Sequence, residues 1–230
     1  MIKIYGKNCI SEALKANAPI KKIFIQKNDN NSLKILERVK EKNIPYELVD
    51  KEFLNKNFTN NNQGLGAYRE NYKTYDLDYV LNNNCKRVLI LDGIADPHNF
   101  GAILRSVDAF GFDAVILGNN RSVPITEVVA HTSTGAIEYT PIIYVNSLLT
   151  AVKKLKENSF WIVGTDASGN KTPNEIDKDL NLAIIIGSEG FGMTRTLVKE
   201  SDFIVKIPMK GHVNSLNASV STGIILSLFM

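Results

Sequence analysis

Three short polar stretches contain the residue types that can do chemistry in this chain, at residues 96–105, 187–193 and 207–219. Each adjoins an apolar run typical of a buried strand and leads into a segment with helical spacing. Ligands of open α/β sheets bind where strands give way to helices. We therefore expect the three stretches to form one composite site.

The second stretch combines three glycines, Gly187, Gly190 and Gly192, with the carboxylate of Glu189. Glycines let backbone amides approach a ligand closely, although simple turn formation explains the same residues. Their spacing, G-x-x-G-x-G, matches neither the dinucleotide-binding fingerprint nor the phosphate-binding P-loop. The pattern therefore disfavours an enzyme that uses nicotinamide cofactors or nucleoside triphosphates.

The first stretch places Asn99 and Arg105 at the start of a predicted helix. A cation in the first turns of a helix is disfavoured by the helix dipole. We therefore expect Arg105 to bind an anionic partner, either Glu189 or a ligand phosphate. A surface ion pair is the alternative.

The third stretch brings Asn214, Ser215, Asn217 and Ser219 together within six residues. One or two of these side chains can cap the C-terminal helix. The polar side chains that capping does not explain indicate hydrogen bonding to a polar ligand.

Histidine and cysteine give no sign of a metal site or a nucleophile. His98, His131 and His212 lack metal-ligand spacing, and no Ser–His–Asp arrangement occurs in the context of a nucleophile elbow. Cys9 and Cys85 are too few for a disulfide framework and are expected to be small buried apolar residues.

The composition is that of an ordinary globular protein, with 230 residues, 44% hydrophobic and 22% charged. No apolar run approaches the about 20 residues that span a bilayer. The N-terminus lacks the features of a signal peptide. We expect a cytoplasmic protein with no membrane association.

The positive charge is concentrated at the beginning of the chain. Residues 1–56 hold 12 Lys and Arg against 7 Asp and Glu, whereas residues 57–230 hold 15 against 17. A basic excess is expected where a protein meets a polyanion. A lysine-rich solvated surface explains it as well.

The apolar periodicity predicts a small α/β module at residues 1–70, a linker at 71–84 and a larger domain at 85–230. In the module we expect helices at 8–17 and 32–42, the latter capped by Ser32, and strands at 22–26, 46–49 and 63–68. In the larger domain we expect strands at 88–91, 114–117, 160–163, 182–186 and 203–207, and helices at 99–110, 147–157, 194–200 and 218–229. This alternation predicts a parallel α/β sheet.

The polar stretches resemble, in order and spacing, the three signature motifs of the SpoU-type RNA ribose 2′-O-methyltransferases of the SPOUT class. They read N-x-G-A-x-x-R at 99–105, G-S-E-G at 187–190, and I-P-M at 207–209 followed by S-L-N-x-S at 215–219. The beginning of the chain, with Y-G-K-N at 5–8, S-E-A-L at 11–14 and Q-G at 63–64, is similar to the small substrate-binding domain of the bacterial 23S rRNA enzymes of this family.

The resemblance implies an α/β SPOUT domain with a C-terminal trefoil knot and a small N-terminal α/β domain with a ribosomal-protein-like RNA-binding fold. It implies S-adenosylmethionine as methyl donor, no metal, RNA as partner, and a homodimer whose active site is completed across the subunit interface. The cofactor-binding residues implied by position are Thr165, Gly187, Gly190, Ile207, Met209 and Leu216. The implied catalytic residues are Asn99, Arg105, Glu189, Ser215 and Asn217.

The implied reaction is an in-line attack of a ribose 2′-oxygen on the donor methyl group. A guanidinium keeps its proton at neutral pH. We therefore interpret Arg105 as a clamp on an RNA phosphate and a stabiliser of charge on the 2′-oxygen, oriented by Asn99 and Glu189. The nucleotide must be unpaired or splayed to be reached.

The most specific hypothesis is methylation of a guanosine in 23S rRNA. A tRNA 2′-O-methyltransferase of the same family is an alternative, although such relatives tend to lack the small N-terminal domain. A resistance-conferring relative is another. A non-catalytic RNA-binding or ribosome-assembly protein on this scaffold would be expected to have lost Asn99, Arg105 or Glu189, and all three are present.

Overall fold

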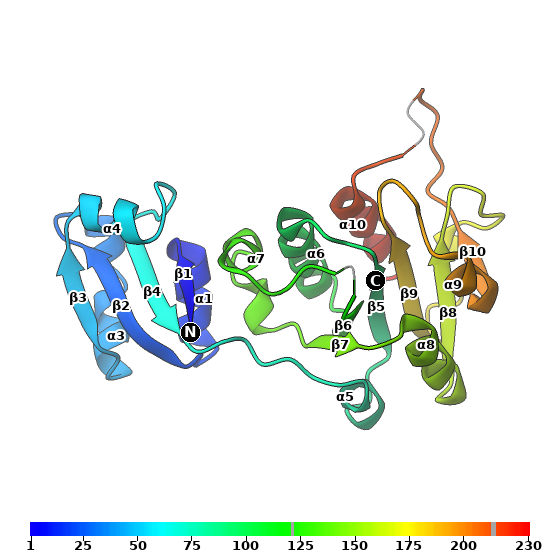
Figure 1. The fold of residues 1–230 in the computed structure, drawn as a ribbon, viewed down its shortest axis with the longest axis horizontal. Helices are drawn as coiled ribbons and strands as arrows, with labels where there is room; N and C mark the ends of the chain where they lie inside the picture. Colours follow the sequence, from blue (N-terminus) through cyan, green and yellow to red (C-terminus); the bar gives the residue numbers. More distant parts are fainter. Residues whose placement is uncertain (121, 213–214) are drawn as a thin grey trace. The chain divides into compact units, whose positions relative to one another are not determined.

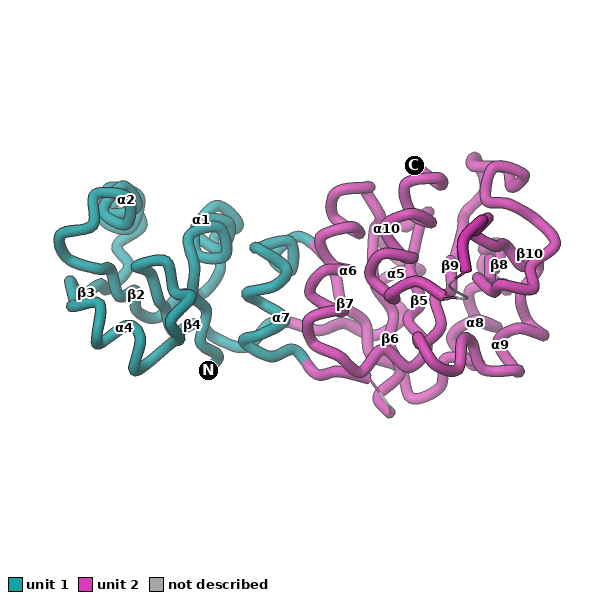
Figure 2. Tube along the Cα trace, turned by 90° about the horizontal axis from the view of Figure 1, so that it is seen from above, with its two compact units in different colours: residues 1–72, 125–139 teal, residues 73–124, 140–230 magenta. Residues whose placement is uncertain are grey.

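The computed structural model describes residues 1–120, 122–212 and 215–230. Contacts within the chain divide it into two compact units (Figure 2). Unit 1 consists of Met1–Tyr72 and Ile125–Tyr139, and unit 2 of Lys73–Pro124 and Thr140–Met230. Residues 125–139 thus fold with unit 1 although they interrupt the sequence of unit 2. In the described part of the chain, no helix has both the length and the apolar character needed to cross a bilayer.

Unit 1 is built on a four-stranded mixed sheet with the order β1-β4-β2-β3 (Figure 1). Its strands are β1 (Ile2–Tyr5), β2 (Ile20–Gln26), β3 (Tyr46–Val49) and β4 (Leu65–Arg69). Strand β4 runs antiparallel to β1 and β2, and β3 runs parallel to β2. Its helices are α1 (Lys7–Lys15), α2 (Asn30–Leu33), α3 (Leu36–Glu41), α4 (Lys51–Asn57), α7 (Glu127–Thr132) and the 3-10 turn η1 (Ala136–Glu138).

The helix predicted at 32–42 is instead two short helices, α2 and α3, and Ser32 does not cap either of them. Asp29 is the N-cap of α2 and accepts a hydrogen bond from the amide of Asn31 at 3.2 Å. The hydroxyl of Ser32 donates to the same carboxylate and is fully buried. An aspartate three residues earlier therefore took the role predicted for the serine.

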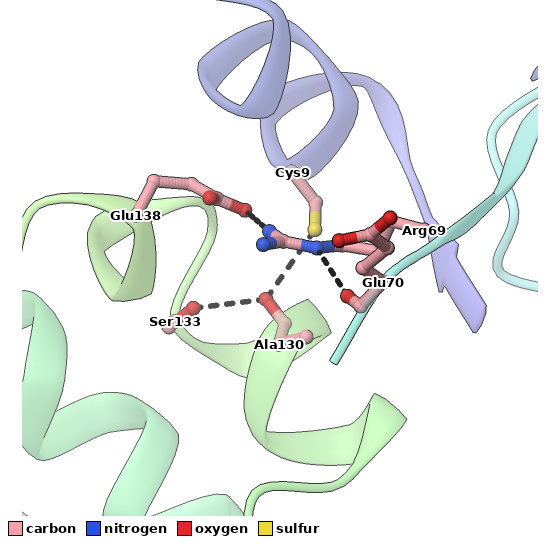
Figure 3. Close-up of polar contacts among 6 residues, drawn as sticks. All are labelled: Cys9, Arg69, Glu70, Ala130, Ser133 and Glu138. Atoms are coloured by element: carbon pink, nitrogen blue, oxygen red, sulfur yellow. Dashed lines mark hydrogen bonds and ion pairs between the residues drawn. The ribbon is translucent and has the colours of Figure 1, made fainter. Parts of the chain in front are cut away.

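A buried polar cluster holds residues 125–139 to the sheet of unit 1 (Figure 3). Arg69 at the end of β4 forms an ion pair with Glu138, and the two side chains are only 4% and 5% exposed. The thiol of Cys9 donates to the carbonyl of Ala130 at 3.5 Å. Nearby, the ring of His131 stacks on Tyr5 with centroids 4.3 Å apart. These contacts make the segment part of the core of unit 1.

Unit 2 is a six-stranded parallel sheet with the order β10-β8-β9-β5-β6-β7. Its strands are β5 (Arg87–Asp92), β6 (Ala114–Gly118), β7 (Ile142–Val145), β8 (Phe160–Thr165), β9 (Asn181–Gly187) and β10 (Phe203–Val205). Its helices are α5 (Asp78–Asn82), α6 (Pro97–Ala109), α8 (Leu148–Glu157), α9 (Arg195–Glu200) and α10 (Ala218–Leu228), with the 3-10 turn η2 (Pro173–Glu175). The parallel sheet confirms the predicted α/β class.

Helices cover both faces of this sheet, because its central strands are apolar on both sides. Val88 and Ile90 of β5 pack in one core with Val152 and Leu155 of α8 and with Leu197 of α9. On the other face, α6 contacts β6, and α10 contacts both β9 and α6. The carboxyl ends of all six strands therefore meet at one edge, between the two helical layers.

Residues 73–84, most of the segment predicted as a linker, belong to unit 2. Tyr75 pairs with Ile143 beside β7, and Leu77 and Val80 at α5 are buried in the core of the unit. Strand β7 itself has only four residues, and the sequence analysis did not identify it.

Candidate active site

The three polar stretches meet in a network of three side chains. Oε1 of Glu189 accepts hydrogen bonds from Nδ2 of Asn99 at 3.1 Å and from Nδ2 of Asn217 at 2.6 Å. It also accepts one from the amide of Ala218 at 2.9 Å. Nδ2 of Asn217 donates in addition to Oδ1 of Asn99 at 2.9 Å. Residues from three distant parts of the sequence are thereby fixed on one carboxylate oxygen.

Strand pairing explains why Asn99 and Glu189 meet. They follow β5 and β9, which are neighbours in the sheet, and Asp92 at the end of β5 lies opposite Gly187 at the end of β9. The chain leaves β5 toward β6 and β7 on one side, while β9, β8 and β10 lie on the other. Ligands of such sheets bind at this reversal of strand order.

Helix capping fixes the other positions of the network. Asp96 caps α6 by accepting hydrogen bonds from the amides of His98 and Asn99, at 3.3 and 3.0 Å. Asn217 caps α10 by accepting from the amide of Ser219 at 3.0 Å. The carboxylate of Glu189 thus lies at the N-terminus of an 11-residue helix, where a negative charge is favoured.

The glycines of the second stretch have different roles. Ser188 and Gly192 exchange backbone hydrogen bonds at 3.1 and 2.9 Å, closing a tight turn over the end of β9. A Cβ on Gly187 would overlap the backbone of Gly192 and Met193, whereas one on Gly190 would meet nothing within 4 Å. The structure therefore requires Gly187 for packing of the turn, which agrees with turn formation, the alternative explanation of these glycines.

A cavity of about 220 Å³ opens beside the network, at the ends of β8, β9 and β10. Five of the six predicted cofactor residues line it, namely Thr165, Gly187, Ile207, Met209 and Leu216. Glu189 and Ser215 of the predicted catalytic set line it as well. Gly190 is not among its lining residues. Asp166 and Ala167 also line it and were not predicted. The sequence feature that could have identified these two residues is the polar turn directly after the strand predicted at 160–163.

Arg105 lies apart from this cavity. It is exposed in a groove between α6 and α10, lined also by Ala102, Phe110, Ser219 and Val220. Among the described residues, Asn99 and Glu189 form hydrogen bonds with each other, with Asn217 and, for Glu189, with the amide of Ala218, and neither bonds to Arg105. Asn214 lies outside the described residues.

The two cysteines are buried and do not supply a nucleophile. Burial raises the pKa of the Cys9 thiol to about 12, with the negative charge of Glu138 as a smaller contribution. Burial likewise raises the pKa of Cys85 to about 11. Because the thiolate is the reactive form, neither side chain is activated at neutral pH.

Comparison with solved structures identifies the class of fold. The chain superimposes on a SpoU methyltransferase, AviRb from Streptomyces viridochromogenes, solved in complex with AdoMet, with a TM-score of 0.83 at 22% identity over 99% of this chain and 88% of that one. An AdoMet-bound rRNA methyltransferase from Sinorhizobium meliloti gives 0.80 at 22% identity, over 99% and 86%. Unit 2 thus has the α/β fold of the SPOUT methyltransferases.

Sequence relatives identify the family. Residues 86–227 match the SpoU rRNA Methylase family, and residues 3–75 match RNA 2′-O ribose methyltransferase substrate binding. A Staphylococcus aureus (strain COL) protein named "Putative TrmH family tRNA/rRNA methyltransferase" is 42% identical over 97% of this chain and 93% of its own length. A protein of the same name from Staphylococcus epidermidis is 41% identical over 98% and 93%. The chain belongs to the SpoU methylase family and is an RNA methyltransferase.

Proposed function

We propose that this RNA methyltransferase transfers a methyl group from S-adenosylmethionine to a ribose 2′-hydroxyl, at a guanosine of 23S rRNA. The observation that carries the proposal is the Asn99–Glu189–Asn217 network at the border of the cavity. It gives a fixed array of amide and carboxylate groups beside a space for a ligand. Fixed polar groups of this kind orient a hydroxyl nucleophile.

The residues of the cavity fit S-adenosylmethionine. Ile186, Ile207, Leu216 and Ile225 give it an apolar wall, and the turn after β9 presents backbone groups. Pockets for small molecules combine such apolar walls with a few polar groups. When bound, the donor supplies a methyl group on a sulfonium centre whose sulfur leaves as a neutral thioether. Thr165, Gly187, Ile207, Met209 and Leu216 would hold it.

Glu189 and Asn99 position the ribose in this proposal. Three donors converge on Oε1 of Glu189, and in the described part of the chain Oε2 accepts no hydrogen bond. The 2′-hydroxyl can donate to Oε2, which aims its oxygen lone pair toward the cavity. Ser215, which lines the cavity, contributes a further hydroxyl.

Arg105 acts as a clamp on an RNA phosphate, and we propose that it serves the site of a second subunit. Its groove is separate from the cavity of its own chain, and beside it Val220 of α10 is 49% exposed. Arginine is enriched at protein–protein interfaces, whose buried centres are apolar. These observations support the homodimer implied by the family motifs.

Methyl transfer to RNA tests the proposal. Labelled S-adenosylmethionine would be supplied with 23S rRNA or, separately, with tRNA, both from cells that lack ribose methylation. We expect label on the rRNA, at the 2′-oxygen of a guanosine, and a loss of at least a hundredfold in Arg105→Ala. Arg87→Ala, at the opposite edge of the sheet, is the matched control and should retain activity.

The distribution of label separates the alternatives. Label confined to tRNA would move the substrate assignment to tRNA, and label on a base would contradict ribose methylation. Binding of S-adenosylmethionine without transfer to either free RNA would move the substrate to an assembling ribosomal particle. Neither binding nor transfer would favour a non-catalytic RNA-binding protein.

A further inference from the structure

A second cavity, of about 260 Å³, opens at the same edge of the unit 2 sheet. It is lined from the ends of β5, β6 and β7 and from the beginnings of α8 and α9, whereas the first cavity is lined from the ends of β8, β9 and β10. The two cavities therefore flank the junction of β5 and β9, from which the catalytic network projects.

The second cavity shares its walls with that network. Asp92 and Gly93 line it and lead directly into the segment of Asn99. Thr194 lines it and lies two residues after the turn that carries Glu189. A Cβ placed on Gly93 would lie 3.5 Å from the Cβ of Ser188, which lines the first cavity. A ribose held by the network would thus have the second cavity beside it.

The chemistry of the second cavity is dominated by the carboxylate of Asp92. This side chain is only 7% exposed, and its Oδ2 accepts a hydrogen bond from the amide of Thr194 at 2.6 Å, which fixes its orientation. Among the described lining residues it is the only ionised group, accompanied by the neutral side chains of Asn120, Asn146 and Thr196. A carboxylate only accepts hydrogen bonds. A ligand group that bonds to Asp92 must therefore be a donor.

We propose that this cavity holds a guanine base of the RNA substrate, with Asp92 accepting from its N1–H and 2-amino groups. Guanine alone among the RNA bases has two adjacent donors on that edge. Adenine and cytosine place an acceptor beside their amino group, and uracil flanks its single N–H with two carbonyls. Leu148 and Leu197 give apolar surface to the ring. The inference rests on the proposed function, because it assumes RNA at the neighbouring network.

Nucleoside binding to the full-length chain tests the assignment directly. Dissociation constants for guanosine, inosine and adenosine would be measured by ligand-observed NMR, because inosine lacks only the 2-amino group. We expect guanosine to bind about tenfold more tightly than inosine. Asp92→Asn keeps an oxygen for the Thr194 amide but replaces the second acceptor by a donor, so guanosine and inosine should then bind equally.

Asp113→Asn is the matched control. Its Oδ2 also accepts backbone amides, from Lys86 at 2.7 Å and Arg87 at 2.9 Å, but at the opposite edge of the sheet. It should retain the preference for guanosine. Equal binding of guanosine and inosine to the unmodified chain, no detectable guanosine binding, or an unchanged preference in Asp92→Asn would overturn the assignment.

Methyl transfer to rRNA, measured in parallel, separates this inference from the proposed function. Transfer without any guanosine preference would overturn the base assignment and leave the methyltransferase reaction intact. A guanosine preference lost in Asp92→Asn, without transfer to any RNA, would support the base site and contradict the proposed reaction.

Discussion

Gly187 and Gly190 lie three residues apart in the same turn, yet the structure gives them opposite sensitivity to an added methyl group. A Cβ on Gly187 overlaps the backbone of Gly192 and Met193, while one on Gly190 projects into open space. We expect Gly187→Ala to lower the free energy of unfolding by about 1–3 kcal/mol. Gly190→Ala should change it by less than about 0.5 kcal/mol. Urea denaturation measures both.

The same pair of variants tests the cofactor site. Because Gly187 lines the first cavity and Gly190 does not, Gly187→Ala should weaken binding of S-adenosylhomocysteine at least tenfold, and Gly190→Ala should leave it unchanged. Isothermal titration calorimetry gives both dissociation constants. The reverse order of sensitivity would contradict this placement of the cofactor and restore the direct role predicted for Gly190.

The buried thiol of Cys9 should make unit 1 less stable at high pH. Its pKa is raised from an ordinary value near 9 to about 12, so between these values the folded chain keeps a proton that the unfolded chain loses. The free energy of unfolding should therefore fall as pH rises from 9 to 12, by up to about 1.4 kcal/mol per pH unit. Urea denaturation of the unmodified chain and of Cys9→Ala should show a shallower fall in the variant.

Cys85→Ala is the comparison for this experiment. The pKa of Cys85 is raised only to about 11, so the fall in the free energy of unfolding that Cys85 causes should end near that pH. Between pH 11 and 12, only Cys9→Ala should differ in slope from the unmodified chain. Identical slopes in all three proteins would contradict the buried, protonated state of Cys9.

Among single residues, sequence reasoning identified Asn99, Glu189 and Asn217, and the structure joins them by hydrogen bonds. These residues were recognisable because they lie in motifs that resemble those of the SpoU-type methyltransferases, whereas side-chain type alone left helix capping and turn formation as alternatives. The position of Arg105 in a separate groove was not predictable in this way. Helical spacing places a residue on its helix but does not specify the neighbouring helix, here α10, that forms the other wall.

At the scale of elements, the segment 125–139 depends on a buried ion pair. Removing one partner leaves an uncompensated charge, so Glu138→Ala should lower the free energy of unfolding of unit 1 by about 3–5 kcal/mol. Hydrogen exchange of the amides in α7 and β4 should accelerate accordingly. Replacing both partners, as Arg69→Met with Glu138→Leu, should recover most of the loss because no charge is left buried. A double variant as unstable as the single one would contradict this explanation.

The elements of unit 2 with long apolar runs were predicted within a few residues, including β5, β6, β9 and α8. Buried parallel strands are continuous apolar segments, and Ser147 caps α8 as its position suggests. Strands β1 and β7 and helix α7 were not identified. Each has only four to six residues, and each is stabilised by partners far away in sequence, as β1 is by β4.

At the scale of the whole molecule, the proposed homodimer makes a specific prediction. Val220 is 49% exposed on α10, beside the groove of Arg105. A buried charge without a partner is costly, and a lysine at position 220 would also lie in the groove of the like-charged Arg105, so Val220→Lys should shift the molecule from dimer to monomer. Leu48→Lys is the matched control, because Leu48 is 47% exposed on β3 of unit 1. Sedimentation equilibrium gives the mass of each protein, and a monomeric unmodified chain would contradict the proposal.

The return of residues 125–139 to unit 1 has a consequence for proteolysis. The backbone passes from one unit to the other three times, after Tyr72, Pro124 and Tyr139. A single cut after Tyr72 would leave the fragment 1–72 attached, because Arg69 and Cys9 would still hold the segment that contains Glu138 and Ala130. The nicked protein would migrate as two bands on a denaturing gel but elute as one species on native chromatography. Release of unit 1 would require two further cuts, on either side of residues 125–139.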